Sequence, residues 1–229
     1  KCDWSSDVCS SDLAWDQKPD LILASGDMLS GDREEGDAIA VALLSRLSDL
    51  APVCFVNGNH EMCVERHQPE RYQKFMDDLK NGGVQVLHNE TAWFWIDGEK
   101  VAVTGYELPW EYYRRFSRRH PSVVGMERSI GKRKQDAYQI LLTHNPVFFE
   151  EYTAWGADFT FAGHLHGGFI RLPYFGGVIS PQFQLFPKYD HGLYQMDTSS
   201  MVVGAGMGNH SGLFRINNPT EVVTVRIKR

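Results

Sequence analysis

Four short polar motifs each follow an apolar run, and together they hold most of the side chains that could perform chemistry. They are SGD, NGNHE, THNP and GHLH, at residues 25–27, 57–61, 143–146 and 163–166. They offer a carboxylate, carboxamides and imidazoles. This mixed nitrogen and oxygen set suits Mn, Fe, Zn or Co better than Mg or Ca, which prefer oxygen ligands alone. The motifs therefore indicate a transition-metal site.

The stretch FAGHLHGG at residues 161–168 places two histidines around one leucine. In an extended segment, His164 and His166 would project to the same side, so each could reach one of two adjacent metals. The neighbouring glycines would let the backbone turn tightly and approach the metals. The alternative for any histidine is an ordinary surface or core residue. We assign it to the five histidines outside the motifs, namely His67, His88, His120, His191 and His210.

The elements that must position these motifs alternate along the chain from residue 21 onward. Apolar runs predict buried strands at residues 21–25, 52–57 and 139–143, and helical spacing predicts helices at about 39–50 and 65–80. Asp97 and Gly98 separate AWFWI from KVAVTGY and predict a hairpin. Three later runs, GLYQM, SMVVGAGMG and EVVTVRI, predict more strands. This pattern is typical of an α/β domain of layered mixed sheets with outer helices.

Composition excludes several classes of protein. The 229 residues are 42% hydrophobic and 23% charged, as in ordinary globular proteins. The formal net charge of −6 disfavours a nucleic-acid partner, which requires a basic face. No run approaches the roughly 18 apolar residues of a membrane-spanning helix, and no basic stretch leads into an apolar run, so no signal peptide is predicted in the sequence as given. As given, the sequence predicts a soluble chain, and its localisation is left open.

The order GD, GNHE, THNP, GHLH resembles the calcineurin-like metallophosphoesterase superfamily from residue 21 to the C-terminus. The tail stretches PKYDHGLYQM and GLFRINNPTEVVTV further resemble its bacterial branch of small, membrane-associated phosphohydrolases. The resemblance implies a four-layer α/β/β/α sandwich of two mixed sheets flanked by helices. It also implies hydrolysis of phosphomonoesters or phosphodiesters by metal-bound hydroxide at a dinuclear centre.

The resemblance implies a role for each motif residue. The implied metal ligands are Asp27, which would bridge two metals, Asn59, His144 and His164 for one metal, and His166 for the other. His60 would not bind metal. It would protonate the leaving oxygen or stabilise the phosphoryl charge, because the unperturbed pKa of histidine is ~6.5.

The N-terminal segment departs from the family pattern. Residues 3–13, DWSSDVCSSDL, are similar to a translated sequencing-adapter strand, so we interpret residues 1–13 as non-native. Residues 14–229 are then a single domain whose first strand is missing, together with the family's D-x-H motif. The metal served by His166 would keep only Asp27 and His166. We therefore expect about one tightly bound divalent metal where the family has two.

A second departure concerns the support of His60. The family often has a second aspartate, four residues in from the glycine of the GD motif, that orients the histidine of GNHE. Here that position is Ser30, and Asp32 is a candidate substitute.

The insert ELPWEYYRRFSRRH, at residues 107–120, carries four arginines among aromatic residues, namely Arg114, Arg115, Arg118 and Arg119. A solvated surface loop is the favoured interpretation. The alternative is a rim that binds an anionic head group or lies on a membrane surface. Separately, a lost N-terminal segment could make the native protein membrane-associated.

Two alternatives to a hydrolase of small phosphoesters remain. A catalytically silent scaffold on the same fold would bind a protein partner, but the intact His60 and ligand residues favour the enzyme. A nucleic-acid phosphodiesterase is disfavoured by the acidic balance.

Overall fold

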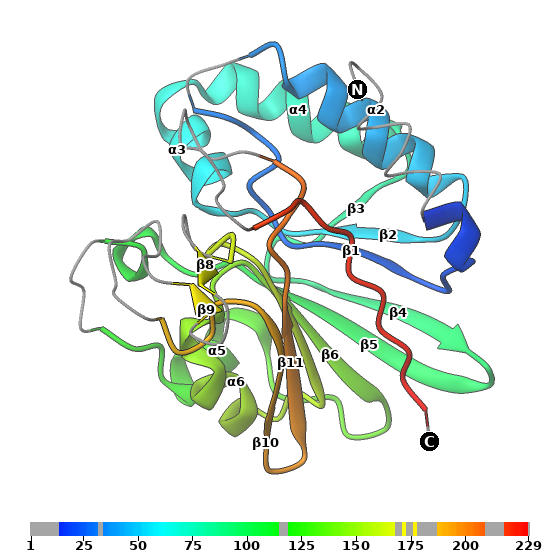
Figure 1. Ribbon diagram of the computed structural model, residues 1–229, viewed down its shortest axis with the longest axis vertical. Helices are drawn as coiled ribbons and strands as arrows, with labels where there is room; N and C mark the ends of the chain where they lie inside the picture. The colour runs from blue at the N-terminus through cyan, green and yellow to red at the C-terminus, as the bar shows by residue number, and fades with distance from the viewer. Residues whose placement is uncertain are drawn as a thin grey trace.

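The structure is a computed structural model that describes residues 14–31, 34–114, 119–167, 171–172, 176–177, 187–208 and 218–228. In this part of the chain two β-sheets lie between two layers of helices (Figure 1). This arrangement confirms the expected α/β/β/α sandwich. Residues 1–13, interpreted as non-native, lie outside the described residues. Among the described helices, none has the length and apolar character needed to cross a bilayer.

The smaller sheet is formed by three parallel strands in the order β1-β2-β3. They are β1 (Ile22–Ala24), β2 (Val53–Phe55) and β3 (Gln85–Val86). The outer face is covered by α2 (Asp37–Ser48) and α4 (Pro69–Asn81) (Figure 1). The central strand β2 is fully buried, whereas β1 is half-buried at the edge of the described part of the sheet. The sequence predicted that the family's first strand, which would pair beside β1, is missing, and this stays a prediction.

The chain between β2 and β3 forms two helices where the sequence predicted one. They are α3 (Asn59–His67) and α4, and they meet at Gln68. Pro69 ends the first helix, because proline lacks an N–H and disfavours a helical conformation in the residue before it. Helix α3 also begins earlier than predicted. As a result, Asn59 and His60 of the NGNHE motif lie in its first turn.

The larger sheet has six strands in the order β10-β11-β7-β6-β5-β4. They are β4 (Thr91–Ile96), β5 (Glu99–Tyr106), β6 (Tyr138–Thr143), β7 (Phe159–Ala162), β10 (Gly192–Met196) and β11 (Ser199–Val203). The sheet is mixed, since the inner pairs are parallel and both edge pairs are antiparallel. Asp97 and Gly98 form the predicted hairpin turn with positive φ angles of 50° and 81°.

The outer face of this sheet is covered by α5 (Val123–Ile130) and α6 (Phe149–Trp155) (Figure 1). Two 3₁₀ turns, Trp110–Tyr112 and Pro146–Phe148, lie in the connections, and the short β8 (Arg171–Leu172) pairs with β9 (Gly176–Gly177). Between the two sheets, apolar side chains of both form a common core, which includes Cys54, Val56, Val103, Ile140 and Leu142. The sheets are thereby fixed relative to each other.

One predicted strand is wrong. EVVTVRI, at residues 221–227, has no strand conformation, and its apolar side chains Val222, Val223 and Ile227 are exposed. Its β-branched pattern suits a strand, but a strand requires a neighbour that supplies hydrogen bonds. None of the described residues pairs with it as a strand.

Candidate metal centre

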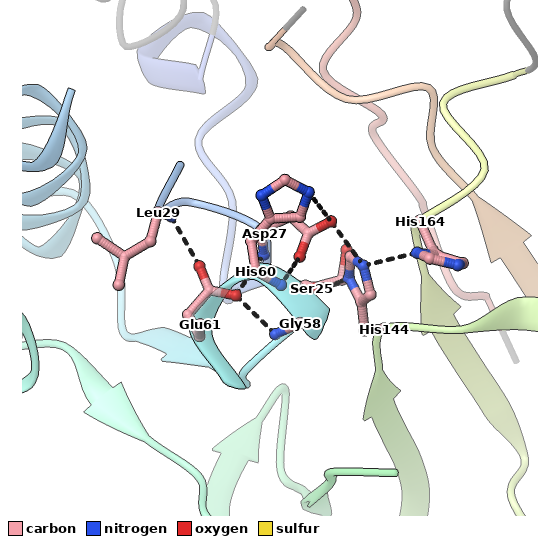
Figure 2. A network of polar contacts seen from close by, with 8 residues as sticks. All are labelled: Ser25, Asp27, Leu29, Gly58, His60, Glu61, His144 and His164. Atoms are coloured by element: carbon pink, nitrogen blue, oxygen red, sulfur yellow. Dashed lines mark hydrogen bonds and ion pairs between the residues drawn. The ribbon is translucent and has the colours of Figure 1, made fainter. Parts of the chain in front are cut away.

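Three of the predicted ligands come together where strands of the two sheets end. Asp27 follows β1 of the smaller sheet, His144 directly follows β6, and His164 follows β7. Their ligand atoms all lie within 4.8 Å of one another (Figure 2). The carboxyl ends of parallel strands share one edge of a sheet, and this is why motifs distant in sequence meet here. The three residues could hold a metal ion.

His144 is oriented as a metal-binding histidine would be. Its Nδ1 lies 2.5 Å from the carbonyl oxygen of Ser25, to which it donates its N–H (Figure 2). In a neutral imidazole this leaves a lone pair on Nε2. That Nε2 lies 3.0 Å from Asp27 Oδ2 and 3.1 Å from His164 Nδ1. A backbone carbonyl that fixes the tautomer in this way is the usual support of a ligating histidine.

Burial and mutual charges shift the pKa values of the three groups in different directions. Burial opposes ionisation of Asp27, but the neighbouring His144, His60 and His164 outweigh it and hold the pKa of the carboxyl well below its usual range. Burial lowers the pKa of His144, and the Asp27 carboxylate more than reverses this, so the net shift is upward. Burial and then the charge of His144 hold the pKa of His164 well below its usual value. The cluster thus keeps the anionic Asp27 carboxylate beside the neutral imidazole of His164, which suits a cation.

The loop that carries Asp27 is packed against the N-terminus of α3. The carboxylate Oδ1 accepts the backbone N–H of His60 at 2.9 Å, which is favourable at the positive end of a helix. Asp27 itself has a left-handed φ of 58°. A Cβ on either Gly26 or Gly58 would collide with the other loop. The two glycines therefore allow the SGD and NGNHE loops to meet backbone to backbone.

Glu61 joins the same two loops, and sequence reasoning gave it no role. It is fully buried, and its carboxylate accepts the N–H groups of Asp27 at 2.8 Å, Leu29 at 2.8 Å and Gly58 at 2.7 Å (Figure 2). Burial, and then the nearby Asp27 carboxylate, raise its pKa. The signal that could have found it is its place three residues after the N-cap Gly58, where glutamate closes a capping box.

His60 lies beside the cluster, and Asn59 precedes it in the first turn of α3. The side-chain Oδ1 of Asn59 is buried and has no hydrogen-bond partner. A buried carbonyl oxygen without a partner is costly, and a metal ion would satisfy it. His60 Nε2 lies 4.0 Å from Asp27 Oδ2, and the His60 side chain is 26% exposed, so it can meet a ligand from solvent.

His166 does not join the cluster, and the expectation of an extended GHLH segment is wrong. Strand β7 ends at Ala162, and His164 and His166 have left-handed φ angles of 66° and 49°. Leu165 between them is fully buried and anchors a tight turn. His166 is therefore not one of the three residues whose ligand atoms lie close together, although its charge contributes to the lowered pKa of His164. His166 Nδ1 lies 3.9 Å from where a Cβ of Gly206 would be.

Tyr113 forms a wall of the cluster that the sequence did not indicate. Its ring centroid lies 5.3 Å from that of His164, edge to face, and 6.0 Å from that of His144. Its hydroxyl is buried and has no hydrogen-bond partner. Burial, and then the charges of nearby groups that include Asp27, raise its pKa well above the usual value. The phenol therefore stays neutral.

Of the other residues that the sequence analysis named around the site, only some are among the described residues. Arg115 and Arg118 lie outside the described residues, as does Asp32, the candidate support of His60. Arg119 forms an exposed 3.1 Å ion pair with Glu111. Contact of this insert with a membrane or an anionic head group stays an untested alternative to the favoured solvated surface loop.

The histidines outside the motifs have structural partners. His88 contacts Glu107 at 3.0 Å, and His120 contacts Glu151 at 2.7 Å. His191 contacts Glu221 at 2.8 Å, and His67 contacts the carbonyl of Cys63 at 2.8 Å. His210 lies outside the described residues. The described members of this group thus fit the interpretation as ordinary histidines.

Comparison with known proteins agrees with this geometry. The family model of the calcineurin-like phosphoesterases matches residues 10–168. The metallophosphoesterase YkuE of Bacillus subtilis is 25% identical over 195 residues, which are 84% of this chain and 62% of YkuE. Phosphodiesterase YaeI of Escherichia coli is 26% identical over 215 residues, which are 94% of this chain and 73% of YaeI. The chain therefore spans less than two thirds of the length of YkuE.

Among solved structures, the NAD nucleotidase NadN of Haemophilus influenzae has a similar fold. The TM-score is 0.53 at 17% sequence identity, over 87% of this chain and 43% of NadN. At this identity the likeness concerns the fold alone.

Proposed function

The chain belongs to the calcineurin-like phosphoesterase family, and from this premise we propose that it is a metal-dependent phosphohydrolase whose site is the Asp27–His144–His164 cluster. The observation that carries the proposal is the orientation of His144. Its Nδ1 is committed to Ser25, so its Nε2 is left to face Asp27 and His164. YaeI is named a phosphodiesterase, so phosphodiesters stand beside phosphomonoesters as candidate substrates.

The donors present fit a divalent transition metal. Asp27, Asn59, His144 and His164 would hold one ion, since they combine one carboxylate, one neutral oxygen and two imidazoles. Asp27 and His166 would hold a second ion more weakly. When bound, such metals act as Lewis acids on the phosphoryl group and lower the pKa of a water molecule. The buried, unpartnered Oδ1 of Asn59 supports its place in this set.

Three residues of the chain would have further roles in hydrolysis. Asp27 offers an anionic carboxylate, held in place by the N–H of His60 and by the N-terminus of α3. His60 reaches solvent and would donate a proton to the leaving oxygen, which removes the need to expel an alkoxide. Glu61 keeps the loops of Asp27 and Gly58 together and thereby sets the distance between carboxylate and proton donor.

A silent scaffold on the same fold is not favoured. Such a protein has no need to gather three ligand atoms within 4.8 Å of one another at the ends of three strands. Nor does it need a backbone carbonyl that selects the metal-binding tautomer of His144.

Metal-dependent turnover tests the proposal. Metal-free protein is supplied with Mn²⁺, Co²⁺, Zn²⁺ or Fe²⁺, and hydrolysis of p-nitrophenyl phosphate and of bis(p-nitrophenyl) phosphate is followed. We expect turnover to depend on added metal. Turnover should keep rising up to the metal concentrations that fill the weaker second site. His144→Ala should abolish it, while His120→Ala, a change at a histidine outside the cluster, should not. Absence of turnover with every metal, or equal turnover in His144→Ala, would reject the proposal.

A further inference from the structure

A segment near the C-terminus lies against the turn that carries His166. Asn218 is 4% exposed, and its Nδ2 donates a hydrogen bond to the backbone carbonyl of His166. Three residues later, the Glu221 carboxylate accepts the N–H of Ala205 at 2.8 Å, and the Glu221 N–H binds the carbonyl of Gly206 at 3.2 Å. The segment from 218 to 221, at the start of the red trace in Figure 1, thus joins two loops.

Both of these loops border the His166 side chain. His166 belongs to the first loop, and Gly206 of the second loop is the residue beside its Nδ1. Glu221 is itself held by a 2.8 Å contact with His191 Nε2, at the start of β10. The two loops beside the imidazole of His166 are therefore held in place relative to each other by the segment from 218 to 221.

The conformation of His166 requires such support. A left-handed φ is uncommon for residues other than glycine and persists where the surroundings over-determine it. Leu165, fully buried, anchors one side of the turn, and Asn218 holds the other. The fit is close, because a Cβ on Gly167 would lie 2.8 Å from Asn218 Oδ1. A side chain at residue 167 would displace Asn218 from the carbonyl.

We propose that Asn218 and Glu221 are positioning residues for His166, so that the C-terminal segment sets the affinity of the second metal position. The proposal rests on the proposed function in one respect, the role of His166 as a ligand. It gives a role to Asn218 and Glu221, which belong to a tail stretch that resembles the family's and are not among the proposed ligands. Loss of the Asn218 hydrogen bond would free the turn and let His166 swing away.

Cobalt binding to individual histidines tests this. Co²⁺ is titrated into the metal-free full chain, and the imidazole ¹H–¹⁵N NMR signals of His164 and His166 are followed separately. Asn218→Ala should raise the Co²⁺ concentration needed to affect His166 by about 10–100-fold, the usual effect of losing an outer partner of a ligand. The response of His164 should not change. Asn218→Leu, which keeps the volume but cannot donate, should behave in the same way.

Thr220→Ala is the matched control, because Thr220 is an exposed residue of the same segment and should change neither response. An unchanged His166 response in both Asn218 variants would overturn the proposal. Equal weakening at His164 and His166 would also overturn it, since the segment would then support the fold as a whole. A wild-type His166 that never responds while His164 does would reject the positioning role and leave the proposed hydrolase intact.

Discussion

The two halves of the candidate centre are built in different ways. His144 is 2% exposed, directly follows the central strand β6 and is tied to Ser25 at the end of β1. His166 is half-exposed, lies on a turn beyond β7, and depends on Asn218, 52 residues further along the chain. Residues at adjacent strand ends are placed by the sheets themselves, whereas a residue on a turn needs a contact from elsewhere. We therefore expect one tight and one weak metal position.

Removing one ligand from each half gives the largest contrast. His144→Ala should weaken the tight ion by more than about 100-fold, because loss of an outer partner alone costs ~10–100-fold. His166→Ala should leave the tight ion in place. Elemental analysis after dialysis measures both. Loss of the tight ion in His166→Ala would contradict the division into two unequal halves.

His60→Ala sharpens the comparison by removing a residue that belongs to neither ligand set. We expect turnover to fall about 10²–10⁴-fold, the usual contribution of a general acid. Metal content should stay that of the wild type. Turnover of a p-nitrophenyl ester and metal analysis are measured on the same preparation. A variant that loses its metal would show that His60 is a ligand and that our separation of roles is wrong.

Tyr113 and Tyr152 provide a matched pair of phenols near the tight half. The hydroxyl of Tyr113 has no partner, whereas that of Tyr152 donates to the carbonyl of Asn145 at 2.7 Å. Tyr113→Phe should raise the free energy of unfolding of the metal-free protein by about 1 kcal/mol, and Tyr152→Phe should lower it by about 1 kcal/mol. Urea denaturation measures both. Changes of the same sign would show that the Tyr113 hydroxyl is satisfied.

The smallest expected effect is a pH dependence of the free energy of unfolding, and it concerns His88. Glu107 accepts the N–H of Asn57 and contacts His88, and this hydrogen bond raises the pKa of His88 above its usual 6.5, against partial burial. A raised pKa in the folded state stabilises the fold below pH 6.5, and this contribution is lost as pH rises through the folded value.

The wild type should therefore have a higher free energy of unfolding than His88→Gln at pH 6. This difference should disappear by pH 8. Since the side chain of His88 is 36% exposed, we expect less than about 1 kcal/mol. Thermal unfolding at both pH values checks this. An advantage that grows with pH would contradict the assignment, and metal binding should be unchanged.

Much of the fold could be predicted, because its signals are local. Apolar runs predicted β1, β2 and β6, and the Asp97-Gly98 turn predicted the β4–β5 hairpin, since each signal depends on a few adjacent residues. EVVTVRI carries an equally good strand pattern, yet it has no partner strand in the described chain. Pattern alone cannot supply a partner.

The candidate site, like the fold, could be predicted only in part from the sequence. Family resemblance identified Asp27, His144 and His164, and the structure brings these three together. The resemblance could not show that GHLH forms a tight turn, because the two positive φ angles of that turn depend on a buried Leu165 and a distant Asn218. Tyr113 was missed for a similar reason, since one tyrosine in an insert gives no sign that it packs against two histidines.

By itself, the sequence determined the layered α/β architecture, the family and the chemical types of the ligands, because motif order and hydrophobic period are properties of the chain alone. Only the tertiary structure decided how those ligands are used. The tautomer of His144 depends on a carbonyl 119 residues away, and the place of Asp27 depends on Glu61 and the start of α3. Hydrogen bonds between residues distant in sequence require that the sheets first pack, and no local pattern encodes that geometry.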